Sequence, residues 1–183
     1  ERVKELFPSD ADYLSVYDRH GLVGPKSVFA HCIHCKPAEW EKMSELQSSI
    51  SFCPSSNMFL GSGLFPRKTA HEENVRVGMG TDVGAGTSMS ILKTLDHAFK
   101  VMQLSGDSEG AHPLNLFYDA TLGAAESLSL GDKVGSIEVG KEADFTVIDL
   151  VNTDMMRHRM DTLFGTTTSC SVADAASASA ATQ

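Results

Sequence analysis

One carboxylate, Asp82, lies in a glycine-rich turn between a short apolar stretch and a helical one. The alternation of Val75 and Val77 before it predicts a β-strand. Glycine permits close backbone approach and positive φ angles. Four glycines surround the carboxylate, namely Gly78, Gly80, Gly84 and Gly86. Asp82 is therefore a candidate functional residue, and the alternative is a turn or helix N-cap aspartate.

A histidine, His31, directly follows the apolar stretch Ser27–Ala30. Neutral imidazole and carboxylate are the donors of a hydrolytic zinc site, which keeps about three protein ligands and a water whose pKa falls to about 7. The Asp82 carboxylate has the chemistry of such a ligand. It also has the chemistry of a general base that takes a proton from the water and passes it to a leaving amine. His31 suits a residue that orients the water or polarises an oxyanion. The alternative for His31 is a buried, hydrogen-bonded histidine at a strand end.

Three other motifs are weaker indications of function. Cys32 and Cys35 match C-x-x-C, but no second ligand pair follows for a structural zinc site, so plain packing is favoured. The adjacent His71 and Glu72 lack the spacing and the P-C-x-x-C segment of zinc deaminases of the cytidine type. The glycines around Asp82 lack the Lys-Ser/Thr pair of a P-loop, and the carboxylate would repel an anion.

Apolar periodicity predicts an alternation of strands and helices. Strands are expected at residues 27–30, 50–53 and 75–79, helices at 12–20, from 37 onward, at 89–104 and at 116–128, and an irregular segment at 54–66. This order is typical of a parallel sheet, in which ligands bind beyond the carboxyl ends of the strands. His31, then Cys53 with the Asn57 loop, then Asp82 follow the three strands in turn.

Cys53 and Asn57 also have structural interpretations that involve no chemistry. Cys53 is interpreted as a small buried hydrophobe. Asn57 is interpreted as a loop residue held by hydrogen bonds to the backbone, or as a support for a metal ligand.

Composition excludes several classes of function. The 183-residue chain carries a net charge of −9 and no basic patch, which argues against a nucleic-acid or anionic-membrane surface. No apolar run is long enough to span a membrane. The four cysteines, without a signal peptide, indicate reduced thiols and a cytoplasmic protein. Because the first residue is Glu1 rather than Met, we expect the chain to start within a longer protein.

The chain is expected to fall into three parts. Residues 1–130 carry the strand and helix alternation, and 131–165 change character, with turn-like glycine segments flanking an expected strand at Phe145–Asp149. Residues 166–183 are rich in Ser, Ala and Thr and are expected to be disordered.

Three segments, residues 27–34, 52–65 and 77–87, resemble the guanine deaminases, a zinc-dependent group within the amidohydrolase superfamily. The likeness runs from Glu1 to about Leu150. It implies an α/β fold, with residues 1–130 as the C-terminal part of a TIM-like (β/α)8 barrel and residues 131–165 as the start of a small β-sandwich. The pattern of the group is lost after Leu163 and Phe164.

The resemblance also implies an activity, the hydrolytic deamination of guanine to xanthine and ammonia with Zn²⁺. Asp82 then corresponds to a catalytic metal-ligand aspartate that also contacts the substrate, and His31 to a catalytic histidine beside the metal and its water. The remaining ligands, a His-x-His pair and a further histidine, are expected upstream of Glu1, so this chain alone is expected to be inactive. A homodimer is expected for the full-length parent.

Two alternatives remain. One is a related ring deaminase or chlorohydrolase of the same superfamily that acts on pterins, triazines or thio-purine analogues. The other is a non-catalytic, degenerate amidohydrolase used as a scaffold.

Overall fold

The chain divides into two compact units, of which the first ends at Asp144 and the second begins at Phe145. The computed structural model describes residues 2–165. The segment 166–183, for which disorder was predicted, lies outside the described residues. The first unit contains the sheet and the candidate site.

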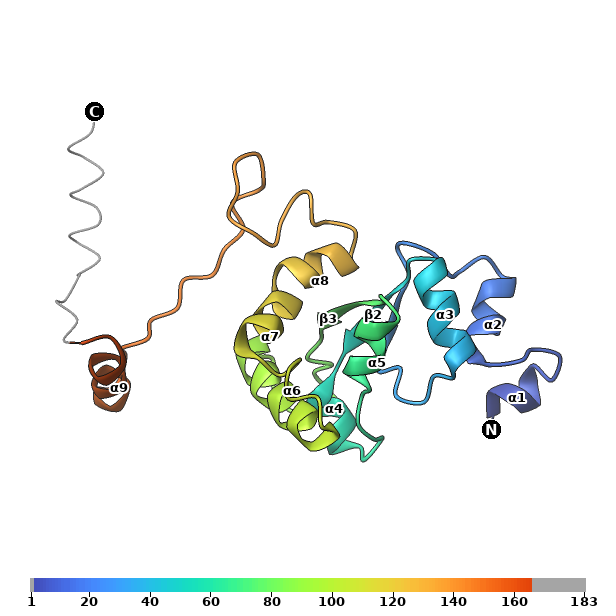
Figure 1. Cartoon of the computed structure of the whole chain (residues 1–183), viewed down its shortest axis with the longest axis horizontal. Coiled ribbons are helices and arrows are strands. Elements are labelled where there is room, and N and C mark those ends of the chain that lie inside the picture. Colours follow the sequence, from blue (N-terminus) through green and yellow to red (C-terminus); the bar gives the residue numbers. More distant parts are fainter. Residues whose placement is uncertain (1, 166–183) are drawn as a thin grey trace. The chain divides into compact units, whose positions relative to one another are not determined.

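A three-stranded parallel sheet forms the centre of the first unit (Figure 1). Its strands are β1 (Val28–Ala30), β2 (Ser49–Phe52) and β3 (Arg76–Met79), in the order β1-β2-β3. Phe29 pairs with Ile50, and Ile50 pairs with Val77, so the three strands are in register at one level. The predicted α/β organisation with a parallel sheet is confirmed.

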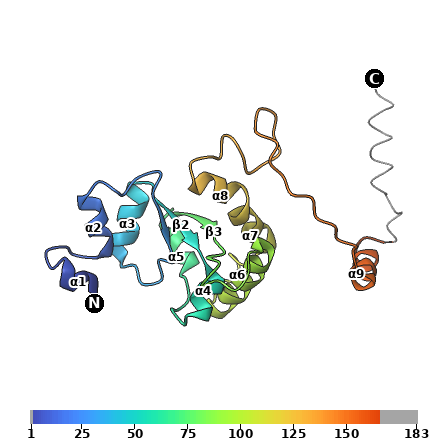
Figure 2. The ribbon, with the colours of Figure 1, turned by 180° about the vertical axis from the view of Figure 1, so that it is seen from behind.

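Helices connect and follow the strands. In the first unit they are α1 (Arg2–Leu6), α2 (Tyr13–Arg19), α3 (Pro37–Glu45), α4 (Pro54–Phe59), α5 (Arg67–Glu72), α6 (Ile91–Ser105), α7 (Pro113–Ala120) and α8 (Leu122–Ser127). The second unit contains α9 (Asp154–Phe164). Figures 1 and 2 both show α2 and α3 on one side of the sheet and α6, α7 and α8 on the other. No helix among the described residues is both long and apolar enough to cross a membrane.

Local signals set several helix ends. The Asp12 carboxylate accepts a hydrogen bond from the Ser15 backbone N–H at 2.8 Å and so caps α2. The Ser90 hydroxyl does the same for α6 through Lys93 N–H. Gly106, with φ of 79°, ends α6 in the left-handed conformation that glycine adopts without strain. These helices therefore begin and end close to the predicted positions.

Three predictions about the elements are wrong. Residues 54–59, predicted to be irregular, form α4, in which Pro54 occupies the first turn and needs no N–H partner. The single helix predicted over 116–128 is broken at Thr121, whose φ of −125° and ψ of −100° are not helical. Phe145–Asp149 forms no strand, because no described segment pairs with it.

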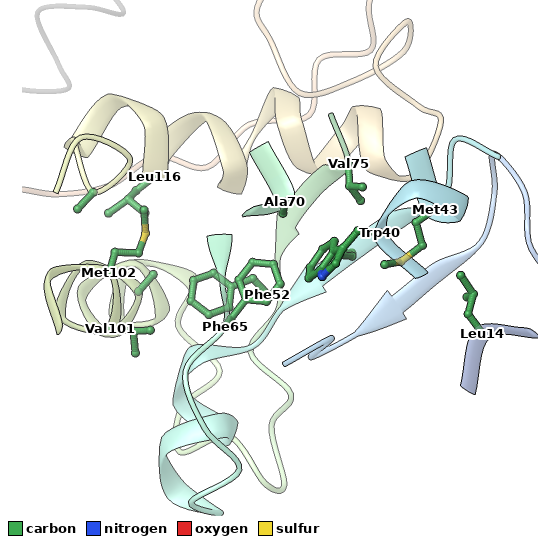
Figure 3. Close-up of a cluster of buried hydrophobic side chains, with 13 residues drawn as sticks. Leu14, Trp40, Met43, Phe52, Phe65, Ala70, Val75, Val101, Met102 and Leu116 are labelled. Carbon is green, nitrogen blue, oxygen red and sulfur yellow. The ribbon is translucent and has the colours of Figure 1, made fainter. Parts of the chain in front are cut away.

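The hydrophobic core lies between the sheet and its helices. Phe52 of β2 packs against Phe65 with ring centroids 4.7 Å apart, and Trp40 of α3 lies 6.3 Å from Phe65 (Figure 3). The other buried members of this core cluster are Leu14, Met43, Ile50, Ala70, Val75, Ala98, Val101, Met102, Ala111 and Leu116. This buried cluster fixes the positions of the strands, and therefore of the residues that follow their carboxyl ends.

Candidate functional site

His31 and Asp82 come together at the carboxyl end of the sheet. His31 directly follows β1, and Asp82 is the third residue after β3. His31 Nε2 lies 3.7 Å from Asp82 Oδ2, and the two side chains are 40% and 38% exposed. The structure thus places both residues singled out from the sequence at one open site. Their catalytic, substrate-binding and metal-binding roles stay predictions.

Both residues adopt left-handed backbone conformations. The φ angle is 69° at His31 and 47° at Asp82. Such a conformation costs on the order of 1–3 kcal/mol for a residue with a side chain, so the surrounding contacts must hold it. The His31 N–H donates to the Ser51 carbonyl at 3.0 Å, and the Gly86 N–H donates to the Asp82 carbonyl. A Cβ on Gly86 would overlap the Thr81 carbonyl oxygen, so only glycine fits this turn.

Gly80 is the second glycine that the turn requires. A Cβ added there would overlap Ser51 Oγ and lie 2.9 Å from Cys53 Sγ. We expect Gly80→Ala to lower the free energy of unfolding by about 1–3 kcal/mol, because the Ser51 and Cys53 side chains must shift to make room for the added methyl group. Urea unfolding followed by circular dichroism measures this. Gly24→Ala is the control, since a Cβ there meets nothing within 4 Å, and an equal loss in both variants would contradict the account.

Asn57, on α4, fixes the orientation of the His31 ring. His31 Nδ1 lies 2.8 Å from Asn57 Oδ1, and Asn57 is 2% exposed. Because an amide oxygen only accepts, Nδ1 carries the proton, and neutral His31 presents the Nε2 lone pair toward Asp82. Asn57 Nδ2 is buried and has no hydrogen-bond partner among the described residues. A buried donor is thus left free beside the site.

Asn57→Leu tests this orienting role. Leucine has a similar volume but accepts no hydrogen bond, so we expect the His31 ring to lose its preference for the Nδ1–H form. Ring ¹⁵N chemical shifts of histidine report the populations of the two neutral forms. Asn115→Leu serves as a control, because Asn115 is exposed and its amide bonds only the Glu109 carbonyl. An unchanged His31 spectrum in Asn57→Leu would contradict the assignment.

A hydrogen-bonded pair missed by the sequence predictions anchors the loop after β3. The Ser55 hydroxyl, on α4, accepts from the Thr87 N–H at 3.0 Å and lies 2.8 Å from the Thr87 hydroxyl. The two residues are 32 positions apart, and no local pattern signals such a bond. Cys53 is buried beneath the loop, as predicted, and burial raises the pKa of its thiol.

The donor atoms suit a zinc ion in type and spacing. Two donors of a tetrahedral zinc site lie about 3.4 Å apart, given metal–ligand distances of about 2.1 Å. The 3.7 Å between His31 Nε2 and Asp82 Oδ2 is close to that separation. Among residues 2–165, no group of three or more His, Cys, Asp or Glu side chains is placed to hold a metal. These residues therefore fit part of a metal site.

A separate cavity of about 690 Å³ lies away from His31 and Asp82. It is lined by residues of α5, β3, α7 and α8, and by the segment that connects α6 to α7. Within its lining, Arg67 donates to Asp119 Oδ2 through Nε at 3.1 Å and Nη2 at 2.9 Å. Their side chains are 13% and 5% exposed. This ion pair links α5 to α7 and has no contact with the candidate site.

Relatives of known identity match the chain closely. Guanine deaminase of Escherichia coli (strain K12) is 50% identical over 159 residues, which cover 87% of this chain and 36% of the relative. The solved structure of the E. coli guanine deaminase matches with a TM-score of 0.81 and 47% identity, over 94% of this chain and 38% of that one. The chain thus spans about a third of the length of the relatives it matches.

Two further solved structures carry ligands. Guanine deaminase from C. acetobutylicum, with guanine bound in its active site, has a TM-score of 0.68 and 32% identity, over 75% of this chain and 34% of that one. An adenosine deaminase from Xanthomonas campestris, with bound zinc, has a TM-score of 0.67 and 32% identity, over 72% of this chain and 30% of that one. The model of the Amidohydrolase family matches residues 1–176. The chain therefore belongs to the amidohydrolase family.

Proposed function

We propose that this chain forms part of a zinc-dependent hydrolase that converts guanine to xanthine and ammonia. The observation that carries the proposal is the placement of His31 Nε2 and Asp82 Oδ2, 3.7 Å apart at the carboxyl ends of parallel strands. The 50% identity to the E. coli guanine deaminase supports the choice of substrate. Active sites of (β/α)8 enzymes lie at this end of the strands.

The proposed architecture extends the observed sheet. We propose that β1, β2 and β3 are three strands of a (β/α)8 barrel, within residues 1–130. Residues 131–165 are proposed to begin a small β-sandwich, in which Phe145–Asp149 would find a partner strand. The exposure of apolar side chains in this region supports the assignment: Ile137, Val139, Phe145 and Val147 are all at least 69% exposed.

Each candidate residue has a proposed role in the reaction. Zinc, when bound, supplies Lewis acidity and lowers the pKa of a coordinated water to about 7. His31 and Asp82 are proposed to contribute donors to that metal. Asp82 also accepts a proton from the attacking water and delivers it to the departing amino group, so that ammonia leaves as a neutral molecule.

His31 contributes through the lone pair of Nε2. With Nδ1–H donated to Asn57 Oδ1, Nε2 carries the only free lone pair of the neutral ring. That lone pair either binds the metal directly or accepts a hydrogen bond from the attacking water beside it. By itself, the 183-residue chain is expected to bind zinc weakly and to leave guanine unchanged, because it supplies only these two donors.

A grafted enzyme tests the proposal. In it, the segment of the E. coli guanine deaminase that aligns with this chain is replaced by the aligned residues of this chain. We expect the grafted enzyme to release ammonia from guanine and to produce xanthine, as measured by ultraviolet absorbance and a coupled ammonia assay. A grafted enzyme that folds and holds zinc but leaves guanine unchanged would contradict the proposed function.

A related ring deaminase is the second candidate, because the zinc-bound X. campestris adenosine deaminase is as similar in structure as one of the guanine deaminases. The same grafted enzyme, offered adenosine, a pterin and a chlorotriazine, distinguishes the two. Higher kcat/KM on any of these than on guanine favours the second candidate. Zinc binding without turnover of any substrate favours a scaffold.

Two further properties are proposed for the longer protein. It is expected to be a cytoplasmic enzyme, and the net charge of −9 supports a small-molecule substrate rather than nucleic acid. It is also expected to form a homodimer. Light scattering of the purified longer protein measures that state.

A further inference from the structure

Cys32 and Cys35 occupy the two corners of a tight turn that follows β1. Ile33 and His34 form the centre of the turn, so the cysteines stand at its first and fourth positions. In such a turn the end Cα atoms are less than about 7 Å apart. Disulfides span Cα separations of about 4.4–6.8 Å. The backbone thus already brings the two cysteines into the range that a disulfide requires.

The two thiols are neighbours on the turn, and both are free. The Cys32 and Cys35 thiols each shift the pKa of the other, and the Cys32 thiol donates to the Phe29 carbonyl at 3.8 Å. Both are reduced and half-buried, so a small reagent can reach them. Cys53, in contrast, is buried, and its sulfur faces Ser51. Among the described cysteines, the pair at the turn is therefore the reactive one.

Bonds outside the cysteines hold both ends of this turn. The His31 N–H donates to Ser51 at its start. After its end, the Lys36 N–H donates to Glu39 Oε2 at 2.9 Å, and buried Glu39 also accepts from the Leu14 N–H at 3.1 Å. Helix α3 then begins at Pro37. Since the backbone is fixed on both sides, forming an S–S bond requires side-chain rotation rather than movement of the chain.

We propose that Cys32 and Cys35 are a reversible oxidation site that closes to an intramolecular disulfide by exchange with a low-molecular-weight disulfide such as oxidised glutathione. One protein thiolate attacks the glutathione disulfide, forming a mixed disulfide and releasing one glutathione. The second thiolate then attacks the protein sulfur of that intermediate and releases the second glutathione. Two protein thiols are oxidised, and one glutathione disulfide is reduced to two thiols, so electrons and protons balance.

One feature favours closure over a stable mixed disulfide. The second thiol is held on the same turn at high effective concentration, so it outcompetes free glutathione. The site is independent of the proposed deaminase function, because neither sulfur is assigned a role in it.

Differential alkylation tests the proposal. The 183-residue chain, carrying Cys170→Ser to remove the fourth cysteine, is equilibrated with oxidised and reduced glutathione at neutral pH. Free thiols are alkylated, disulfides are then reduced, and a second reagent labels the sulfurs that were protected. Peptide mass spectrometry locates each label. We expect Cys32 and Cys35 to become protected together, at least about tenfold more than Cys53, with a mass lower by two hydrogens and no attached glutathione.

Matched variants decide between closure and simple modification. In Cys35→Ser, Cys32 has no partner, so protection should fall at least about tenfold or appear only as a glutathione adduct. Cys53→Ala should leave the disulfide unchanged, and circular dichroism checks that each variant is folded. Independent glutathione adducts on both cysteines of the unsubstituted pair, or a disulfide from either to Cys53, would overturn the proposal.

Discussion

Asp82→Asn in the grafted enzyme is expected to lower kcat/KM for guanine by about a hundredfold to ten-thousandfold, the range associated with loss of a general acid–base group. Asparagine has the same shape and tolerates the positive φ of 47° at this position, so the turn is retained. The amide neither carries the negative charge of a metal ligand nor accepts a proton. The decrease is therefore expected in chemistry and zinc content, not in folding.

Asp96→Asn provides the control for this loss. Asp96 is an exposed residue of α6 that pairs with Lys100 and lies outside the turn that holds Asp82. Its substitution removes the same charge and is expected to leave kcat/KM and zinc content unchanged. Steady-state kinetics and metal analysis by mass spectrometry measure both. If Asp82→Asn behaves like Asp96→Asn, the assignment of Asp82 to the reaction is wrong.

Arg67→Met is expected to cause the largest loss of stability, about 3–5 kcal/mol, because it leaves a buried carboxylate without its partner. Asp119 is 3% exposed, and Arg67 donates two hydrogen bonds to one of its oxygens. Urea unfolding of the 183-residue chain at pH 7 measures the loss. Lys100→Met, which breaks an exposed pair with Asp96, is the control and is expected to change stability far less.

The pH dependence of Arg67→Met separates this explanation from a simple packing defect. Burial raises the pKa of Asp119, and the nearby Arg67 lowers it, with burial the stronger effect. Without Arg67 the pKa rises further. At pH values between the pKa of Asp119 in the unfolded state and its higher pKa in the folded state, the folded protein binds more protons. The stability of the variant therefore rises as the pH falls through that range. The loss in the free energy of unfolding caused by Arg67→Met should therefore become smaller as the pH is lowered. A loss caused by a packing defect would not depend on pH.

The sequence allowed the strands and the two principal site residues to be predicted, since both signals are local. β-Branched and apolar runs mark β1, β2 and β3, and polar residues at their carboxyl ends are predicted to converge in any parallel sheet. His31 and Asp82 follow from that rule. Gly86 follows as well, because a turn that brings the Gly86 N–H to the Asp82 carbonyl has no room for a Cβ.

The interactions that support the site depend on distant residues and had no local signal. The bond between His31 and Asn57 joins residues 26 positions apart, and it requires α4, which the sequence analysis treated as irregular. Pro54 led to the prediction of an irregular segment, because proline interrupts helices when it lies in their interior. In the first turn of a helix, where Pro54 lies, proline is favourable. The Arg67–Asp119 pair spans 52 positions, so only the assembled fold reveals it.

The break between α7 and α8 also had no signal in the sequence. A 13-residue apolar pattern over 116–128 satisfies helical periodicity throughout. The structure interrupts it at Thr121, whose φ of −125° and ψ of −100° are not helical. The chain is tightly packed just after this point, because a Cβ on Gly123 would lie 2.7 Å from the Tyr118 ring. Helical periodicity alone therefore does not predict where α7 ends and α8 begins.

Zinc-edge anomalous diffraction from crystals of the grafted enzyme tests the central claim most directly. The account predicts an anomalous peak within coordination distance of the Asp82 carboxylate, with the His31 ring turned toward it and Nδ1 still bonded to Asn57. A fully occupied zinc bound elsewhere, with Asp82 and His31 making no contact to the metal or its water, would contradict the account.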